Sequence, residues 1–159
     1  MVASLTMRTG ADLKRISKEL RRMNDKEIKK RFTKEMRAAA KPIVPAVRTA
    51  IRNIPSKRGY SADGLRGRMA AATKLEVRTV GKDAGVRIRV DGRKMPDKQK
   101  ALQSYMEGVK PRWRHPVFGH DVWVQQKSHP YFFRTVDPLA ARTQVQIFKA
   151  IDQVGKDIS

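Results

Sequence analysis

The spacing of the apolar residues changes along this chain, and the change restricts the folds open to it. In residues 11–51 apolar side chains recur every three or four positions, the period of one helix face. In residues 86–90 valine and isoleucine alternate strictly with arginine, the period of a half-buried strand. The helical period returns from about residue 131. This order predicts an α+β fold, with N-terminal helices and a long C-terminal helix packed on a small antiparallel sheet.

The first third of the chain predicts two helices and a break. Residues 11–23 form an amphipathic helical pattern. Asn24 followed by Glu27 has the spacing of a capping box, with Asn24 as the N-cap of a second helix. Pro42 and Pro45 lie inside the second helical pattern. Because proline removes a backbone donor and crowds the preceding turn, we expect a kink or a restart near these two residues.

The middle of the chain predicts a loop, a short helix and a hairpin. These elements are an exposed loop at 55–64, a helix at 65–73, and strands at 75–80 and 86–90. The connection GKDAG has glycine at both ends, as a tight turn between strands requires. One face of the second strand is apolar and should be buried, whereas the face with Arg87 and Arg89 should meet water or a partner.

The last third predicts elements of mixed type. They are a helix at 97–108, an irregular loop at 109–121, a short strand at 122–126, and a final helix from about 131 to 157. Pro138 lies in the first turns of the final helix, so we expect it to restart or kink that helix. The chain, 1–159, should form a single domain with frayed tails at 1–10 and 155–159.

The charge is strongly positive and uneven. Lysine and arginine total 36 and aspartate and glutamate total 15, which gives a formal net charge of +21. Residues 1–58 alone hold 17 basic and five acidic residues. A field of this size attracts phosphates, anionic surfaces or an acidic protein. On the second predicted helix we single out Lys29, Lys30 and Lys34 as candidates to face DNA or an acidic partner, without reading base sequence.

Several function classes find no support in the residues. The chain has no cysteine, which excludes disulfides, thiolate zinc sites and cysteine nucleophiles. Its three histidines, with Asp121 beside one of them, match no metal-ligand spacing, so we expect no metal and no cofactor. There is no phosphate-binding glycine motif and no nucleophile elbow, so we expect no enzyme. No apolar run is long enough to cross a membrane, so no membrane partner is expected.

Aromatic residues are concentrated in one short stretch. Six of the ten in the chain lie between residues 113 and 133, interleaved with arginine and lysine. Three interpretations stay open: a core that anchors the sheet to the last helix, an interface between subunits, or a platform on which bases stack. The candidates for inter-subunit contacts are Trp113, Arg114, His115, Phe118, Trp123 and Tyr131.

Residues in this stretch carry a family resemblance. The run WRHPVFG at 113–119, then WVQQ at 123–126, then PYFF at 130–133 before a long helix, resembles the tail-completion, or head–tail joining, proteins of long-tailed double-stranded DNA bacteriophages. The upstream segments AAAKPIVPAVRTAI and GVRIRVDG agree with this pattern. The resemblance spans about residues 11–157, and none of its motifs is catalytic.

The resemblance implies a structural virion protein of the head–tail junction, or neck, that is assembled in the host cytoplasm. Such a subunit forms a ring, commonly of six copies, which completes the top of the tail and lets DNA pass. Its implied partners are copies of itself, a connector or head-closure protein above, the tail tube or a terminator below, and, transiently, double-stranded DNA. In such a ring we expect Arg87 and Arg89 to face the lumen or the next ring.

Two alternatives to tail completion remain open. The first is a tail terminator or head-closure protein of the same neck region, because these proteins share size and position. The second is a basic protein that binds nucleic acid without sequence preference, which the net charge alone would favour.

Overall fold

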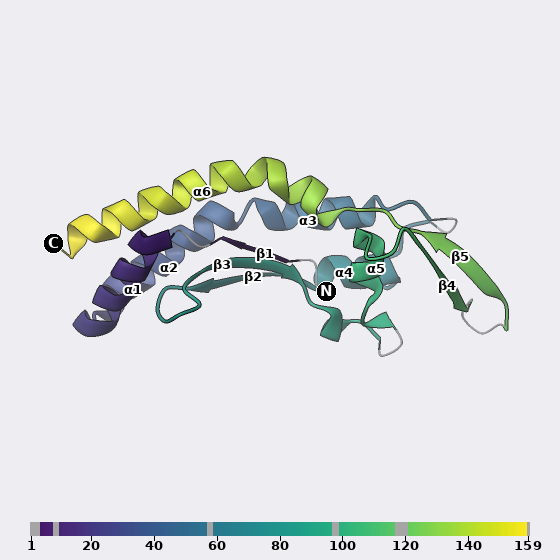
Figure 1. Ribbon diagram of the computed structural model, residues 1–159, viewed down its shortest axis with the longest axis horizontal. Coiled ribbons are helices and arrows are strands. Elements are labelled where there is room, and N and C mark those ends of the chain that lie inside the picture. The colour runs from purple at the N-terminus through teal and green to yellow at the C-terminus, as the bar shows by residue number, and fades with distance from the viewer. Residues whose placement is uncertain (1–3, 8–9, 57–58, 97–98, 117–120, 159) are drawn as a thin grey trace.

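The computed structural model describes residues 4–7, 10–56, 59–96, 99–116 and 121–158. The elements in chain order are β1 (Ser4–Met7), α1 (Gly10–Met23), α2 (Lys26–Ala40), α3 (Ile43–Arg52), α4 (Leu65–Ala71), β2 (Thr73–Arg78), β3 (Gly85–Val90), the 3₁₀ turn η1 (Gly92–Lys94), α5 (Leu102–Glu107), β4 (Arg112–Pro116), β5 (Trp123–Lys127) and α6 (Phe132–Asp157). This order and the two small antiparallel sheets confirm the predicted α+β class (Figure 1).

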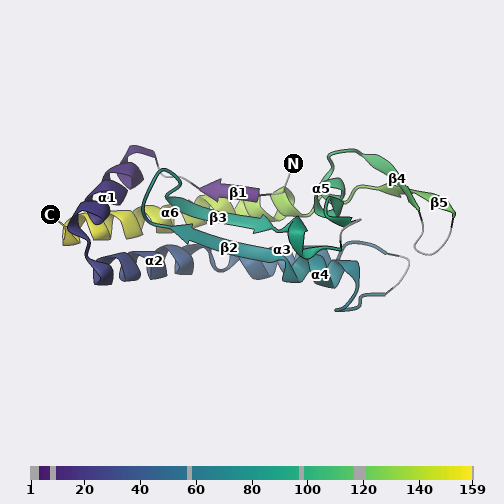
Figure 2. The same cartoon turned by 90° about the horizontal axis from the view of Figure 1, so that it is seen from below.

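The main body has two layers. Strands β1, β3 and β2 form an antiparallel sheet in that order, and helices α2, α3 and α6 lie on one of its faces (Figures 1 and 2). Val86, Ile88 and Val90 of the central strand point into this interface and are fully buried, as the alternation predicts. Among the described residues, no helix covers the opposite face, where Arg87 is exposed.

The start of α2 differs from the prediction by one residue. Asp25 is the N-cap, and its Oδ1 accepts hydrogen bonds from the backbone N–H of Glu27 at 2.8 Å and of Ile28 at 3.0 Å. Asn24, the predicted cap, instead adopts a left-handed conformation with φ 52°. The prediction of a capping box with Asn24 as the N-cap was therefore wrong. Asn24 makes the turn between the two helices, a conformation that asparagine tolerates better than most residues.

The predicted break near the two prolines is confirmed. Helix α2 ends at Ala40 and α3 begins at Ile43, with Pro42 in the N-cap position. Pro45 falls in the first turn of α3, where its missing N–H would have no partner within the helix. The restart lets Ile43, Val47 and Ile51 bury a new apolar face against the body of the protein.

The structure corrects two further predictions and narrows a third. Residues 112–116, predicted as irregular loop, form strand β4, because they pair along their length with β5. The helix predicted at 97–108 is confined to α5, Leu102–Glu107, and residues 97 and 98 lie outside the described part. Helix α6 does not restart at Pro138. This proline lies on the exposed side of the helix, where water can bind the carbonyl left without an N–H.

Two elements extend into the segments predicted to fray. Strand β1 pairs antiparallel with β3, with Ser4 opposite Arg89 and Met7 opposite Val86. Helix α6 continues to Asp157.

In the described part of the chain, no helix combines the length and the apolar character needed to cross a membrane.

Candidate interaction surfaces

A two-stranded hairpin extends away from the main body. Strands β4 and β5 pair in register from Arg112 opposite Lys127 to Pro116 opposite Trp123. We call these ten residues, 112–116 and 123–127, the arm. Figures 1 and 2 place it at one end of the elongated molecule, with α1 and the C-terminal end of α6 at the other end.

The two faces of the arm differ in burial. Its inner face is half-buried: Trp113 stacks on Tyr105 of α5 with ring centroids 5.4 Å apart, and His115 Nε2 lies 3.3 Å from the side-chain oxygen of Gln126. Its outer face is exposed along its length and consists of Arg112, Arg114, Pro116, Trp123, Gln125 and Lys127. The indole of Trp123 is therefore offered to solvent, with 57% of the residue exposed.

The base of the arm is fixed by a cap on α6. The Glu107 carboxylate, at the end of α5, accepts hydrogen bonds from the backbone N–H of Tyr131, Phe132 and Phe133 at 2.9, 2.7 and 3.0 Å. These are donors that the first turn of a helix leaves without intrahelical partners. The carboxylate thus ties α5, which precedes the arm, to α6, which follows it, although more than 20 residues separate them.

The structure assigns the predicted contact residues to different environments. Trp113, Arg114, His115 and Trp123 lie together on the arm, whereas Phe118 lies outside the described residues. Tyr131 is only 3% exposed, and its burial raises the pKa of its phenol, with the Glu107 charge adding to the effect. Tyr131 therefore belongs to the core and offers no exposed contact surface.

The interpretation of the aromatic stretch as core holds for part of it. Phe132, at the start of α6, is fully buried and belongs to the hydrophobic core. The same interpretation predicts that Trp123, like Phe132, anchors the sheet to the last helix, but Trp123 is exposed on the arm. For Trp123 an interface or a stacking role remains.

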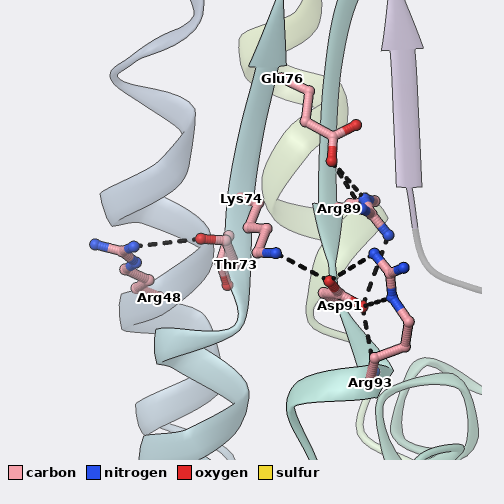
Figure 3. A network of polar contacts seen from close by, with 7 residues as sticks. All are labelled: Arg48, Thr73, Lys74, Glu76, Arg89, Asp91 and Arg93. Atoms are coloured by element: carbon pink, nitrogen blue, oxygen red, sulfur yellow. Dashed lines mark hydrogen bonds and ion pairs between the residues drawn. The ribbon is translucent and has the colours of Figure 1, made fainter.

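The uncovered face of the main sheet carries a network of ion pairs, drawn in Figure 3. Arg89 donates from Nε and Nη2 to Glu76 Oε1 at 3.0 and 2.7 Å. Lys74 Nζ donates to Asp91 Oδ2 at 3.0 Å, and Arg93 donates from Nε and Nη2 to the two oxygens of Asp91 at 3.0 and 3.1 Å. We call these five residues the Asp91 network.

The Asp91 network neutralises most of the positive charge at its centre. The Asp91 side chain is only 4% exposed. Its bonds from Arg93 hold the pKa of its carboxyl well below the usual range, against the opposite effect of burial, and Lys74 and Arg89 act in the same direction as Arg93. Asp91 in turn raises the pKa of the Arg93 guanidinium. The charge of Arg89 is thus divided between two carboxylates of its own chain.

The two arginines predicted to face the lumen or the next ring therefore differ from each other. Arg89 is committed to Glu76 and Asp91, whereas Arg87, two residues away on the same face, is exposed and has no ion pair with a described residue. At the edge of the sheet, Arg48 of α3 donates to the backbone oxygen of Thr73 (Figure 3) and to that of Ala70. Arg48 thereby fixes the start of β2 on α3.

The three lysines predicted to face DNA or an acidic partner also differ in their exposure. Lys29 is half-buried and its Nζ lies 3.4 Å from Asn24 Oδ1, whereas Lys30 and Lys34 are exposed.

Sequence reasoning missed Glu107 and Asp91. Glu107 bonds amides more than 20 residues away, which no local motif marks. Asp91 lies two residues from Arg89 and Arg93, but its burial and its bond with Lys74 depend on the neighbouring strand.

Neither a metal-binding cluster nor a comparison with known proteins points to a function. Among the described residues, no three His, Asp or Glu side chains gather closely enough to hold a metal ion. Comparisons with protein-family models, with curated proteins and with solved structures each found no match to this chain.

Proposed function

We propose that this protein is a ring-forming structural subunit of the head–tail junction of a long-tailed double-stranded DNA bacteriophage. In this role it completes the top of the tail and joins it to the connector while DNA passes through the ring. The proposal rests on the resemblance of residues 113–133 to tail-completion proteins. The structural observation that supports it most is the arm, whose outer face leaves Trp123 57% exposed.

An arm of this kind is suited to a contact with another molecule. A two-stranded hairpin on its own is marginally stable in water, so it gains from a partner that covers a face or an edge. Tryptophan and arginine are also the residues that contribute most to protein interfaces. Trp123, Arg112 and Arg114 lie on the same face of the arm, which therefore resembles the exposed half of an interface.

The arrangement of the arm is compatible with a ring. The arm lies at one end of an elongated subunit, from which it can reach a different surface on the next copy. Such a heterologous contact closes into a ring when the rotation between copies is a whole fraction of a turn. We propose six copies, with a connector or head-closure protein on one side and the tail tube or a terminator on the other. The subunit itself catalyses no reaction in this role.

Electron microscopy of particles made without the protein tests the proposal. We expect DNA-filled heads beside separate tails that look finished. Normal, infectious particles in its absence would contradict the neck role.

A variant then tests the arm. Trp123→Ala should leave the fold intact, because the side chain is exposed, and should reproduce the unjoined heads and tails. Val145→Ala removes a similarly exposed apolar side chain from α6 and serves as the matched control. Joined particles with Trp123→Ala would remove the arm from the ring contact.

A further inference from the structure

Five cations form one continuous stripe along α2. They recur at intervals of four, four, three and four residues, which places them on one side of the helix. The members are Lys26, Lys30, Lys34, Arg37 and Lys41, the last of which is the C-cap residue, and each is exposed. We call them the α2 basic stripe. At 1.5 Å per residue the stripe is about 22 Å long.

The cations of the stripe are not neutralised within the described part of the chain. None of the five side chains has an ion pair or hydrogen bond with a described residue, whereas their neighbour Arg31 pairs with Asp157 of α6. The two acids of α2, Glu27 and Glu35, pair with none of them either. Like charges three or four residues apart destabilise a helix. The helix therefore carries a repulsion that an external anion would relieve.

The stripe is held rigidly and faces outward. Another side of α2 buries Phe32, Met36 and Ala40 in the core, where the helix packs against α6 and the sheet. This packing fixes the rotation of α2 about its axis, so the stripe cannot turn into the protein. The stripe also lies away from the arm, because α2 and the arm occupy opposite parts of the molecule (Figures 1 and 2).

The chemistry of the stripe favours a phosphate backbone over a protein surface. Protein interfaces depend on a few large apolar or aromatic anchors, and no large apolar side chain of α2 is exposed. Double-stranded DNA presents one phosphate about every 3.4 Å of axis on each strand. A stripe about 22 Å long laid along the duplex therefore covers an axial length of roughly six base pairs, and the two strands together present more phosphates over that length than the stripe has cations. The lysine-rich composition supplies charge without groups arranged to read base edges.

We propose that the α2 basic stripe binds the phosphate backbone of double-stranded DNA without sequence preference. The open sheet face, where Arg89 is neutralised by Glu76 and Asp91, is the weaker surface for this purpose. The inference deepens the proposed function by naming the surface that meets DNA, and it rests on that function for where the duplex is met. Its test uses the purified full chain, so the two proposals can fail separately.

Salt-dependent binding to a labelled duplex of mixed sequence, followed by fluorescence anisotropy, tests the inference. Each phosphate contact contributes about 0.9 to the slope of log affinity against log salt. Five contacts predict that affinity falls about 500-fold between 50 and 200 mM salt. The triple variant Lys30→Gln, Lys34→Gln, Arg37→Gln leaves two contacts, so its affinity should fall only about 12-fold over the same range.

A matched control separates the stripe from the general positive charge. The triple variant Arg134→Gln, Arg142→Gln, Lys149→Gln removes three exposed cations of α6 and so lowers the net charge equally. It should keep a slope close to that of the unmodified protein. Thermal melts followed by circular dichroism establish that both variants fold. Equal loss of slope in the two variants, or an unmodified protein that does not bind the duplex at 50 mM salt, would overturn the inference.

The outcomes also separate this inference from the neck role. Normal particles made without the protein, together with stripe-dependent binding, would refute the neck role and leave the DNA-binding surface. Unjoined heads and tails, together with no duplex binding, would support the neck role and refute the surface.

Discussion

Removal of the Glu107 carboxylate should lower the stability of the fold, because this group holds the start of its longest helix. It bonds three consecutive amides at the start of α6, a helix of 26 residues that supplies much of the core. The amides of Tyr131 and Phe132 are part-buried, and both bond Oε2, whereas that of Phe133 is exposed and bonds Oε1. Water can replace the carboxylate at the exposed amide, and it reaches the other two less well.

The expected loss of stability is estimated from the two part-buried amides. A hydrogen bond to a charged group contributes about 1.5 kcal/mol at the low end of its usual range, so Glu107→Ala should lower the free energy of unfolding by about 3 kcal/mol. Glu107→Gln keeps one oxygen acceptor but loses the charge. Since neutral hydrogen bonds are roughly half as strong as charged ones, this variant should lose about 1.5 kcal/mol.

Urea unfolding followed by circular dichroism measures both losses. We expect midpoints in the order unmodified protein, Gln variant, Ala variant, with little change in the slope m. The melting temperature of the Ala variant should fall by roughly 6–12 °C. Asp152→Ala, at an exposed position of α6 without a described partner, is the control and should stay within about 0.5 kcal/mol. A loss below about 1 kcal/mol for Glu107→Ala, or no difference between Ala and Gln, would refute the cap as the anchor of α6.

Three further predictions concern the Asp91 network, one glycine and the tryptophans. The folded pKa of Asp91 lies well below its ordinary value of 3.8, so its stabilisation is complete above about pH 5 and is lost as the pH falls toward the folded pKa. The difference in urea midpoint between the unmodified protein and Asp91→Asn should therefore narrow steadily below about pH 5 and persist in part at pH 2, and a constant difference would contradict this. Gly67→Ala should destabilise by about 1–2 kcal/mol in thermal melts, since its Cβ would overlap the backbone oxygen of Ala62. Gly59→Ala, with nothing within 4 Å of its Cβ, should not destabilise the protein. Trp113→Ala should lower the free energy of unfolding by about 2 kcal/mol, because it removes a half-buried side chain that stacks on Tyr105. Trp123→Ala removes an exposed side chain and should lower it by less than about 0.5 kcal/mol. Equal losses in urea unfolding would contradict the assigned burial.

The elements that sequence reasoning located correctly are those whose signal is local and repeated. The alternation at 86–90 identifies β3 and its buried face, because a two-residue period leaves one choice of side. The helical spacing at 11–23 identifies α1 for the same kind of reason. Strand β4 was missed because Pro111, Pro116 and Gly119 indicate a loop, whereas the pairing of Arg112–Pro116 with β5 makes it a strand.

What could not be predicted depends on partners far away in sequence. Strand β1 has four residues, and only its pairing with β3 makes it a strand. The role of Glu107 depends on amides 24 to 26 residues away, and a lone glutamate at the end of a short helix is ordinarily a solvated side chain. The distinction between Arg87 and Arg89 arises from Glu76 on the neighbouring strand. A periodic pattern predicts which face a side chain lies on, but it does not predict which residue that side chain contacts.

The pairing of β1 with β3 has a consequence for how the chain is made. Ser4 and its partner Arg89 are more than 80 positions apart, and α2 is covered by a helix that begins at Phe132. At about 5–20 residues per second, roughly 5 to 20 seconds separate the synthesis of α2 from that of α6. During that interval the apolar side of α2 lacks its cover, and β1 waits longest of all the strands for its neighbour. The nascent chain is therefore most exposed to aggregation just before its last helix leaves the ribosome.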